Sequence, residues 1–161
     1  MSVSTVMPAI LAALKAKVEA VTGIAGVAPV YDYWRHVTDE KELRDIFMGG
    51  SQARLHWWCV TPAGADTLSI WHLSGCDQAN PARFDLHGFY AVKDADASEK
   101  AFHTIVWALL DALLADKSLT GSAVPLIGQL PLPVWAENDH RMLVGTLLHH
   151  ARIAVAVKAE L

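Results

Sequence analysis

The sequence predicts an α+β domain in which an N-terminal helix and a long central helix pack on one face of a mostly antiparallel sheet. Residues 96–116 carry apolar side chains at spacings of three and four, which is typical of one face of an α-helix. Strand-like runs lie on both sides of this segment in the sequence. Because a long one-sided helix buries its apolar face against another layer, we expect those runs to form a sheet beneath it.

The central helix has a clear apolar stripe and a clear start. The stripe consists of Phe102, Ile105, Val106, Leu109, Leu110, Leu113 and Leu114. Asp96 is expected to cap the N-terminus, and Glu99, three residues later, can reach back to the N–H of the cap. Gly121 breaks the pattern at the other end. The stripe is therefore the predicted centre of the core.

The elements before this helix are predicted from periodicity and from breaks at glycine and proline. Residues 3–22 form a first helix, and residues 27–37 a first strand. The densest charge run follows at 38–50, where Thr38 is expected to cap a short helix. Residues 55–60 and 67–73 are two strands joined by a turn.

Residues 83–92 alternate apolar and polar side chains and form the cleanest strand before the central helix. After the helix, three prolines in 124–135 predict an edge strand or an extended crossover. Residues 137–141 are interpreted as a polar turn, and 145–158 as the closing strand.

Size and composition favour a single domain, residues 1–161, with an arm or loop insertion at about 38–54. The chain is 53% apolar and only 19% charged, with a mean hydropathy of +0.26, so a subunit that hides surface against copies of itself is expected. The net charge of −4 and the scattered Lys and Arg argue against a dedicated nucleic-acid binder. No apolar run reaches membrane-spanning length and no signal peptide is recognisable. Cys59 and Cys76 form no CxxC motif and no disulfide framework, so an intracellular, reducing compartment is expected.

Two adjacent tryptophans suggest a subunit interface. Trp57 and Trp58 must point to opposite faces of their strand, so one enters the core and the other needs a second cover. A neighbouring subunit is a plausible cover, because exposed indoles waste apolar area. The charged arm precedes this strand directly. The predicted interface residues are therefore Trp57 and Trp58, with Arg44 and Arg54 pairing with acidic groups of the neighbour.

The sequence contains no motif for a catalytic or cofactor site. Nucleophile-elbow, phosphate-loop and dinucleotide-binding patterns are absent, and Asp139, His140 and Arg141 resemble a catalytic cluster only in composition. His149 and His150 are neighbours on a strand and cannot share an ion, while the pair of His72 and Cys76 lacks a third ligand. We therefore predict no catalytic residue, no metal and no cofactor.

The order of elements resembles the tail terminator, or tail completion, proteins of long-tailed phages and related gene transfer agents. The resemblance rests on four segments in order along the chain: GIAGV at 23–27 leading to VYD, RFDLHGFY at 83–90, ENDHR at 137–141 and GTLLHHARI at 145–153. It covers roughly residues 5–158. No invariant motif anchors it.

The resemblance implies a structural virion protein of the tail and neck, assembled in the host cytoplasm. Proteins of this kind form a hexameric ring on the tail tube, stop its polymerisation and present a surface to the head connector. They carry no catalytic residues, and DNA meets them only in passage through the ring. The implied partners are copies of this chain, the tail tube protein and the connector or neck proteins.

Two alternatives remain open from the sequence. The first is a small α+β enzyme or ligand-binding domain with a pocket between helix 96–116 and the sheet, near Trp71 and His87. The second is another phage neck or head-completion protein. A mass measured in solution separates a ring subunit from a monomer that binds a small molecule.

Overall fold

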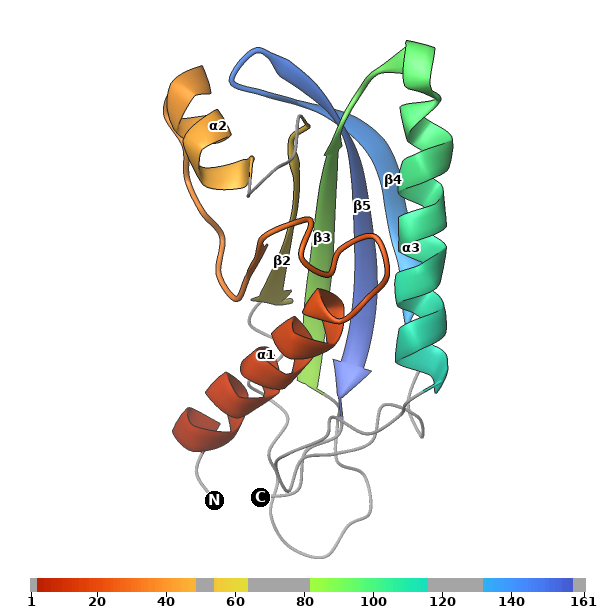
Figure 1. Cartoon of the computed structure of the whole chain (residues 1–161). Coiled ribbons are helices and arrows are strands. Elements are labelled where there is room, and N and C mark those ends of the chain that lie inside the picture. The colour runs from red at the N-terminus through yellow and green to blue at the C-terminus, as the bar shows by residue number, and fades with distance from the viewer. Residues whose placement is uncertain (1–2, 49–53, 64–81, 116–131, 158–161) are drawn as a thin grey trace, which may run out of the picture.

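The computed structural model describes residues 3–48, 54–63, 82–115 and 132–157, which form three α-helices and a five-stranded sheet (Figure 1). In chain order the elements are α1 Val3–Glu19, β1 Val30–Tyr31, α2 Glu40–Phe47, β2 His56–Pro62, β3 Ala82–Ala91, a 3₁₀ turn at Asp94–Asp96, α3 Ser98–Ala115, β4 Val134–Leu143 and β5 Thr146–Val157. The predicted α+β class is confirmed. The predicted strand 67–73 lies outside the described residues.

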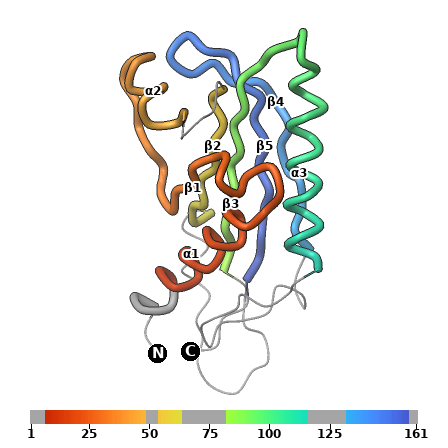
Figure 2. The backbone as a smooth tube through the Cα atoms, viewed as in Figure 1, coloured from red at the N-terminus to blue at the C-terminus, as the bar shows by residue number. Residues whose placement is uncertain are grey.

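The sheet has the strand order β1-β2-β3-β5-β4. Strands β2, β3, β5 and β4 pair antiparallel, and only the two-residue β1 runs parallel to its neighbour β2 (Figure 2). The predicted strand at 27–37 is wrong for most of its length. After Tyr31 the chain leaves the sheet plane, so that Trp34 places its ring against His87 and Phe89 of β3.

One face of the sheet, called the helix face below, is covered by α1 and α3 (Figure 1). The helices contribute fully buried side chains at helical spacing: Ile10, Leu14 and Val18 from α1, and Phe102, Val106, Leu109 and Leu113 from α3. Trp58 of β2 enters this core. Its indole lies over Gly88 of β3, where a Cβ would meet the ring at 2.5 Å. Only glycine therefore leaves room for the tryptophan.

The opposite face, called the second face, is partly covered by α2. Asp39 caps this helix by accepting a hydrogen bond from the Glu42 N–H at 2.8 Å. The predicted cap, Thr38, instead donates to the Glu42 carboxylate. Leu43 and Phe47 are buried against the sheet. The described part of the predicted arm is thus a helix that packs on its own chain.

The predicted capping box of the central helix is wrong. α3 begins at Ser98, two residues after Asp96. The Asp96 N–H donates to the Lys93 carbonyl, and the Asp96 carboxylate pairs with Lys93 and Arg54. The Asp96 carboxylate is therefore engaged in ion pairs and does not form the cap that the local sequence predicted.

The predicted polar turn at 137–141 is also wrong, because these residues lie within β4. The actual turn is Val144 and Gly145, both at positive φ, which is the geometry of a two-residue hairpin loop. β4 is an edge strand and tolerates polar residues, since one side of it faces solvent. The predicted closing strand is confirmed as β5.

Candidate functional site

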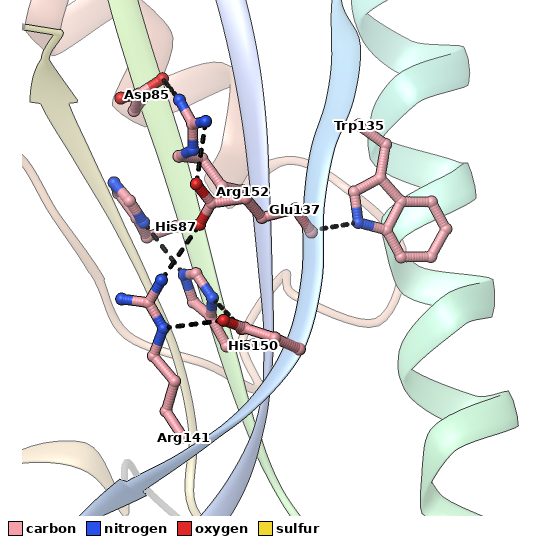
Figure 3. A network of polar contacts seen from close by, with 8 residues as sticks. Asp85, His87, Trp135, Glu137, Arg141, His150 and Arg152 are labelled. Atoms are coloured by element: carbon pink, nitrogen blue, oxygen red, sulfur yellow. Dashed lines mark hydrogen bonds and ion pairs between the residues drawn. The ribbon is translucent and has the colours of Figure 1, made fainter.

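Charged and titratable side chains gather on the second face where β3, β5 and β4 lie side by side. A bulge between Trp135 and Glu137 reverses the alternation of β4, so Trp135 packs on the helix face and Glu137 on the second face. Asp139 and Arg141 follow Glu137 on that side. The polar network, as we call it, consists of Asp85, His87, Glu137, Asp139, Arg141, His150 and Arg152 (Figure 3).

Two arginines connect the carboxylates of the polar network. Arg152 contacts Asp85 at 3.2 Å and Glu137 at 2.9 Å, so it joins β3, β5 and β4. Arg141 contacts the other oxygen of Glu137 at 3.0 Å and Asp139 at 3.4 Å. Opposite charges on neighbouring strands stabilise the register of the edge strand.

A histidine chain runs through the middle of the network. The Asp139 carboxylate lies 2.6 Å from Nδ1 of His150, and Nε2 of His150 lies 3.1 Å from Nδ1 of His87. An ionised carboxylate can only accept, so Nδ1 of His150 carries a proton. Burial lowers the pKa of His150 and favours its neutral form, in which Nε2 accepts and Nδ1 of His87 donates. Both imidazoles are neutral in this arrangement.

The pKa shifts agree with neutral imidazoles and an ionised carboxylate. Burial, helped by the charges of Arg141 and Arg152, lowers the pKa of His87 to about 4. Burial also lowers the pKa of His150, although its bond to Asp139 acts the other way. For Asp139, burial opposes ionisation, but the hydrogen bond from His150 and the charge and hydrogen bond of Arg141 outweigh it and lower the pKa.

Glu137, Asp139 and His150 bring three potential ligand atoms within 4.8 Å of one another. This grouping was not predicted from the sequence, because the grouping depends on cross-strand register and not on spacing along the chain. Both carboxylates already pair with arginine, and His150 Nδ1 carries a proton toward Asp139. The arrangement therefore holds β4 against β5 and β3, and a cation would have to displace these pairs.

An aromatic pocket of about 250 Å³ lies beside the polar network on the second face. Its walls include Tyr31, Trp34, Phe47, Trp57 and Phe89, and Arg35 and Arg141 also line it. Cys59 lies at its base, where burial raises the pKa of the thiol to about 12. The thiol is therefore a packing group and not a nucleophile.

Of the four predicted interface residues, both tryptophans are buried within the chain. Trp58 is fully buried on the helix face, and Trp57 is 4% exposed on the second face. Trp57 stacks between Phe47 of α2 and Phe89 of β3, at centroid distances of 4.1 and 4.7 Å. The expectation that a neighbouring subunit covers one indole is wrong, because α2 of the same chain covers it.

The two predicted interface arginines have partners within the chain. Arg44 pairs with Glu40 one turn earlier on α2, at 2.7 Å, and remains exposed. Arg54 donates to the Tyr90 hydroxyl at 2.9 Å and pairs with Asp96. Pairing across a subunit joint by Arg44 stays a prediction.

The exposed aromatic side chains are not the ones that the sequence predicted at a subunit interface. Trp107 of α3 is 54% exposed, and Leu114 is exposed two turns further along the helix. Tyr33 and Trp34 are exposed beside the aromatic pocket. One signal was available for Trp107, which lies outside the apolar stripe of its own helix and so faces away from the sheet.

The pocket predicted between the central helix and the sheet does not form near His87. His87 lies on the second face, across the sheet from α3, and contacts Trp34 and His150. Trp71 lies outside the described residues, as do His72 and Cys76. Among the described residues, no helix is long and apolar enough to cross a membrane.

No protein-family model matches this chain, and no curated protein is similar to it. A solved structure is similar over 100% of this chain and 97% of its own length, at 16% sequence identity and a TM-score of 0.45. Its name indicates no function. A likeness at this level does not establish a shared fold or activity.

Proposed function

We propose that this chain is a structural subunit of a phage-type tail, a tail terminator that forms a hexameric ring on the tail tube. The observation that carries the proposal is the presence of two separate apolar surfaces. One is the aromatic pocket with Tyr33 and Trp34, and the other is the outward side of α3 with Trp107 and Leu114. A ring built from identical subunits needs two different contact surfaces on each of them.

The two surfaces lie on different sides of the molecule. In Figure 1, α2 and α3 lie on different sides of the sheet. The pocket is lined by Phe47 of α2 and by side chains of the second face, and the exposed Trp107 belongs to α3, which covers the other face. Large apolar side chains at such positions favour protein contacts. Aromatic residues are also enriched in the centres of interfaces.

In this proposal the ring ends tube polymerisation and offers its far side to the head connector or neck proteins. Its partners are copies of this chain, the tail tube protein and the connector, and DNA passes through its lumen. The role requires no covalent chemistry. It places the protein in the tail and neck of a virion after assembly in the host cytoplasm.

The experiment combines a solution mass with a tube-capping assay. Sedimentation velocity of the purified chain, alone and with tubes of the tail tube protein from the same genome, is expected to show six copies per ring. Electron microscopy is expected to show rings at tube ends and shorter tubes when the chain is present during polymerisation. A protein that stays monomeric in both conditions and leaves tube length unchanged would overturn the proposal.

The same assay separates the alternatives. A head-completion protein is expected to bind connector rings and to leave tube length unchanged. A ligand-binding domain is expected to stay monomeric.

A further inference from the structure

We infer that the aromatic pocket of one subunit receives Trp107 of the next subunit, so that a side chain and a hollow form the joint between copies of this chain. The inference rests on the proposed ring and names the residues that would build it. It follows from the size and lining of the pocket, the exposure of Trp107 and the charges beside each.

The pocket suits one large aromatic side chain. Trp34, Phe89 and Trp57 line a volume of about 250 Å³. Trp57 and Phe89 are stacked on each other and are each 4% exposed, whereas Trp34 is 42% exposed, so Trp34 is the wall on which an entering ring can stack or pack edge to face. An indole entering the pocket would meet ring surface and would displace water from an apolar hollow.

Trp107 has the exposure that such a contact needs. It is 54% exposed, and its neighbour on the helix surface is the ring of His103 at a centroid distance of 6.0 Å. Leu114, seven residues on, lies on the same side of α3 and is 39% exposed. A tryptophan held on a rigid helix loses little conformational entropy when it is buried, and an indole buries roughly 150–250 Å².

The charges beside the two surfaces are complementary. Arg35, which lines the pocket, is stacked over the rings of Tyr31 and Tyr33 at 5.0 and 5.8 Å. Asp111 lies one turn after Trp107 and is exposed. Within the described part of the chain, neither Arg35 nor Asp111 has an ion-pair partner. In the inferred joint, Asp111 of one subunit pairs with Arg35 of the next.

A single chain cannot make this contact with itself, because the pocket and Trp107 belong to opposite faces of its sheet. A contact between two different surfaces can be made twice in a two-fold dimer, or it can pass from subunit to subunit until a ring closes or an open chain forms. This is the type of contact that a tail terminator ring requires.

The first test is a charge exchange followed by sedimentation velocity over a range of protein concentrations. Arg35→Asp and Asp111→Arg are each expected to weaken self-association at least about tenfold, because like charges then face each other. The double variant restores an opposite pair at every joint and is expected to regain assembly. Trp107→Ala is expected to weaken association by about 30-fold or more, as at interface hot spots. Leu147→Ala, at an exposed apolar residue of the β4–β5 hairpin, is the matched control and should assemble normally.

The second test mixes two deficient variants, Trp107→Ala with an intact pocket and Arg35→Asp with an intact Trp107. Each is expected to be monomeric alone, and the equimolar mixture is expected to form one-to-one pairs and nothing larger. Circular dichroism spectra of every variant should match the wild type, and each variant should unfold cooperatively. Single variants that assemble normally, or a mixture that stays monomeric, overturn the inference.

The outcomes separate this inference from the proposed function. Wild-type hexamers that persist in Trp107→Ala overturn the contact and leave the tail terminator in place. Wild-type dimers or open chains that are lost in Trp107→Ala support the contact and overturn the terminator. A wild type that is monomeric with and without tail tubes overturns both.

Discussion

The two faces of one sheet have opposite characters in this molecule. On the helix face, β5 contributes Ala151, Ile153 and Val155 to a core that α1 and α3 close. On the second face the same strand contributes His150 and Arg152 to a network of ion pairs. Because successive side chains of a strand point to opposite faces, one strand contributes to the apolar core on one face and to the ion pairs on the other. The helix face is completed within the chain, whereas the second face is completed only where α2 covers it, and there the aromatic pocket remains open.

The largest expected effect comes from placing a charge on the helix face. Leu109→Asp puts an unpaired carboxylate among fully buried side chains, which costs several kcal/mol and is comparable to the stability of a whole domain. We expect insoluble protein on expression. Leu110 is only partly buried, so Leu110→Asp should be milder.

Trp107→Asp is the matched control on the same helix, because Trp107 faces away from the core. It should yield soluble protein with a thermal midpoint near that of the wild type. Soluble, cooperatively folding Leu109→Asp protein would show that the helix face is not the main core.

The second prediction compares the adjacent tryptophans directly. Trp58→Ala and Trp57→Ala should each lose about 3–5 kcal/mol of unfolding free energy, because each empties a large buried site. The loss should be greater for Trp58, which fills the space left by Gly88, than for Trp57, whose cover is the short helix α2. Urea denaturation of both, with Trp107→Ala as control, measures the difference. A Trp57→Ala protein of wild-type stability would show that α2 does not pack as described.

Periodicity along the chain predicted most of the fold, because the spacing of apolar residues in a helix or strand shows which of its sides is buried. Phe102, Val106, Leu109 and Leu113 of α3 and the alternation of β3 and β5 fell where the structure has them, whereas Leu114, predicted in the same stripe, is 39% exposed. The opposite directions of Trp57 and Trp58 followed from strand geometry alone.

The predictions that were wrong concern residues whose interaction partners could not be inferred from the local sequence pattern. Asp96 was assigned to a helix cap, but Arg54 and Lys93 pair with it. The polar residues from Glu137 to Arg141 suggested a turn, because their partners Arg152 and His150 come from another strand. The aromatic pocket could not be predicted either, since its walls come from β1 and the segment after it, α2, β2, β3 and β4, which meet only in the folded chain.

Acid should destabilise the protein through histidines on both faces. On the helix face, Nε2 of His56 accepts a hydrogen bond from the Trp58 indole N–H at 3.0 Å, and burial lowers the His56 pKa to about 4. Burial likewise lowers the pKa of His87 on the second face to about 4. At a pH between about 6.5, the pKa in the unfolded chain, and about 4, the pKa in the folded chain, these histidines are protonated in the unfolded chain and neutral in the folded chain. Stability is therefore complete above about pH 6.5 and falls as the pH drops toward 4, by on the order of 3 kcal/mol for His56.

Urea denaturation at pH 7, 6 and 5 measures this slope above the range where carboxyl groups titrate. His56→Gln keeps a hydrogen-bond acceptor for Trp58 but cannot be protonated, so its slope should be shallower than that of the wild type. His87→Gln should show a smaller change, since His87 is only partly buried. Equal slopes in all three proteins would mean that neither histidine resists protonation in the folded state.

The smallest expected effect concerns Arg44, which the sequence placed at a subunit joint. In the structure it is an exposed residue of α2 that pairs with Glu40 at 2.7 Å, a pair of the kind worth about 0.3–0.5 kcal/mol. Arg44→Asp should therefore change the unfolding free energy by less than about 1 kcal/mol. Because α2 serves to cover Trp57, and the joint we infer runs through the aromatic pocket and Trp107, the mass in solution should equal that of the wild type. Sedimentation velocity beside Arg35→Asp provides the comparison. Loss of assembly in Arg44→Asp, with Arg35→Asp unaffected, would move the joint from the pocket to the exposed side of α2.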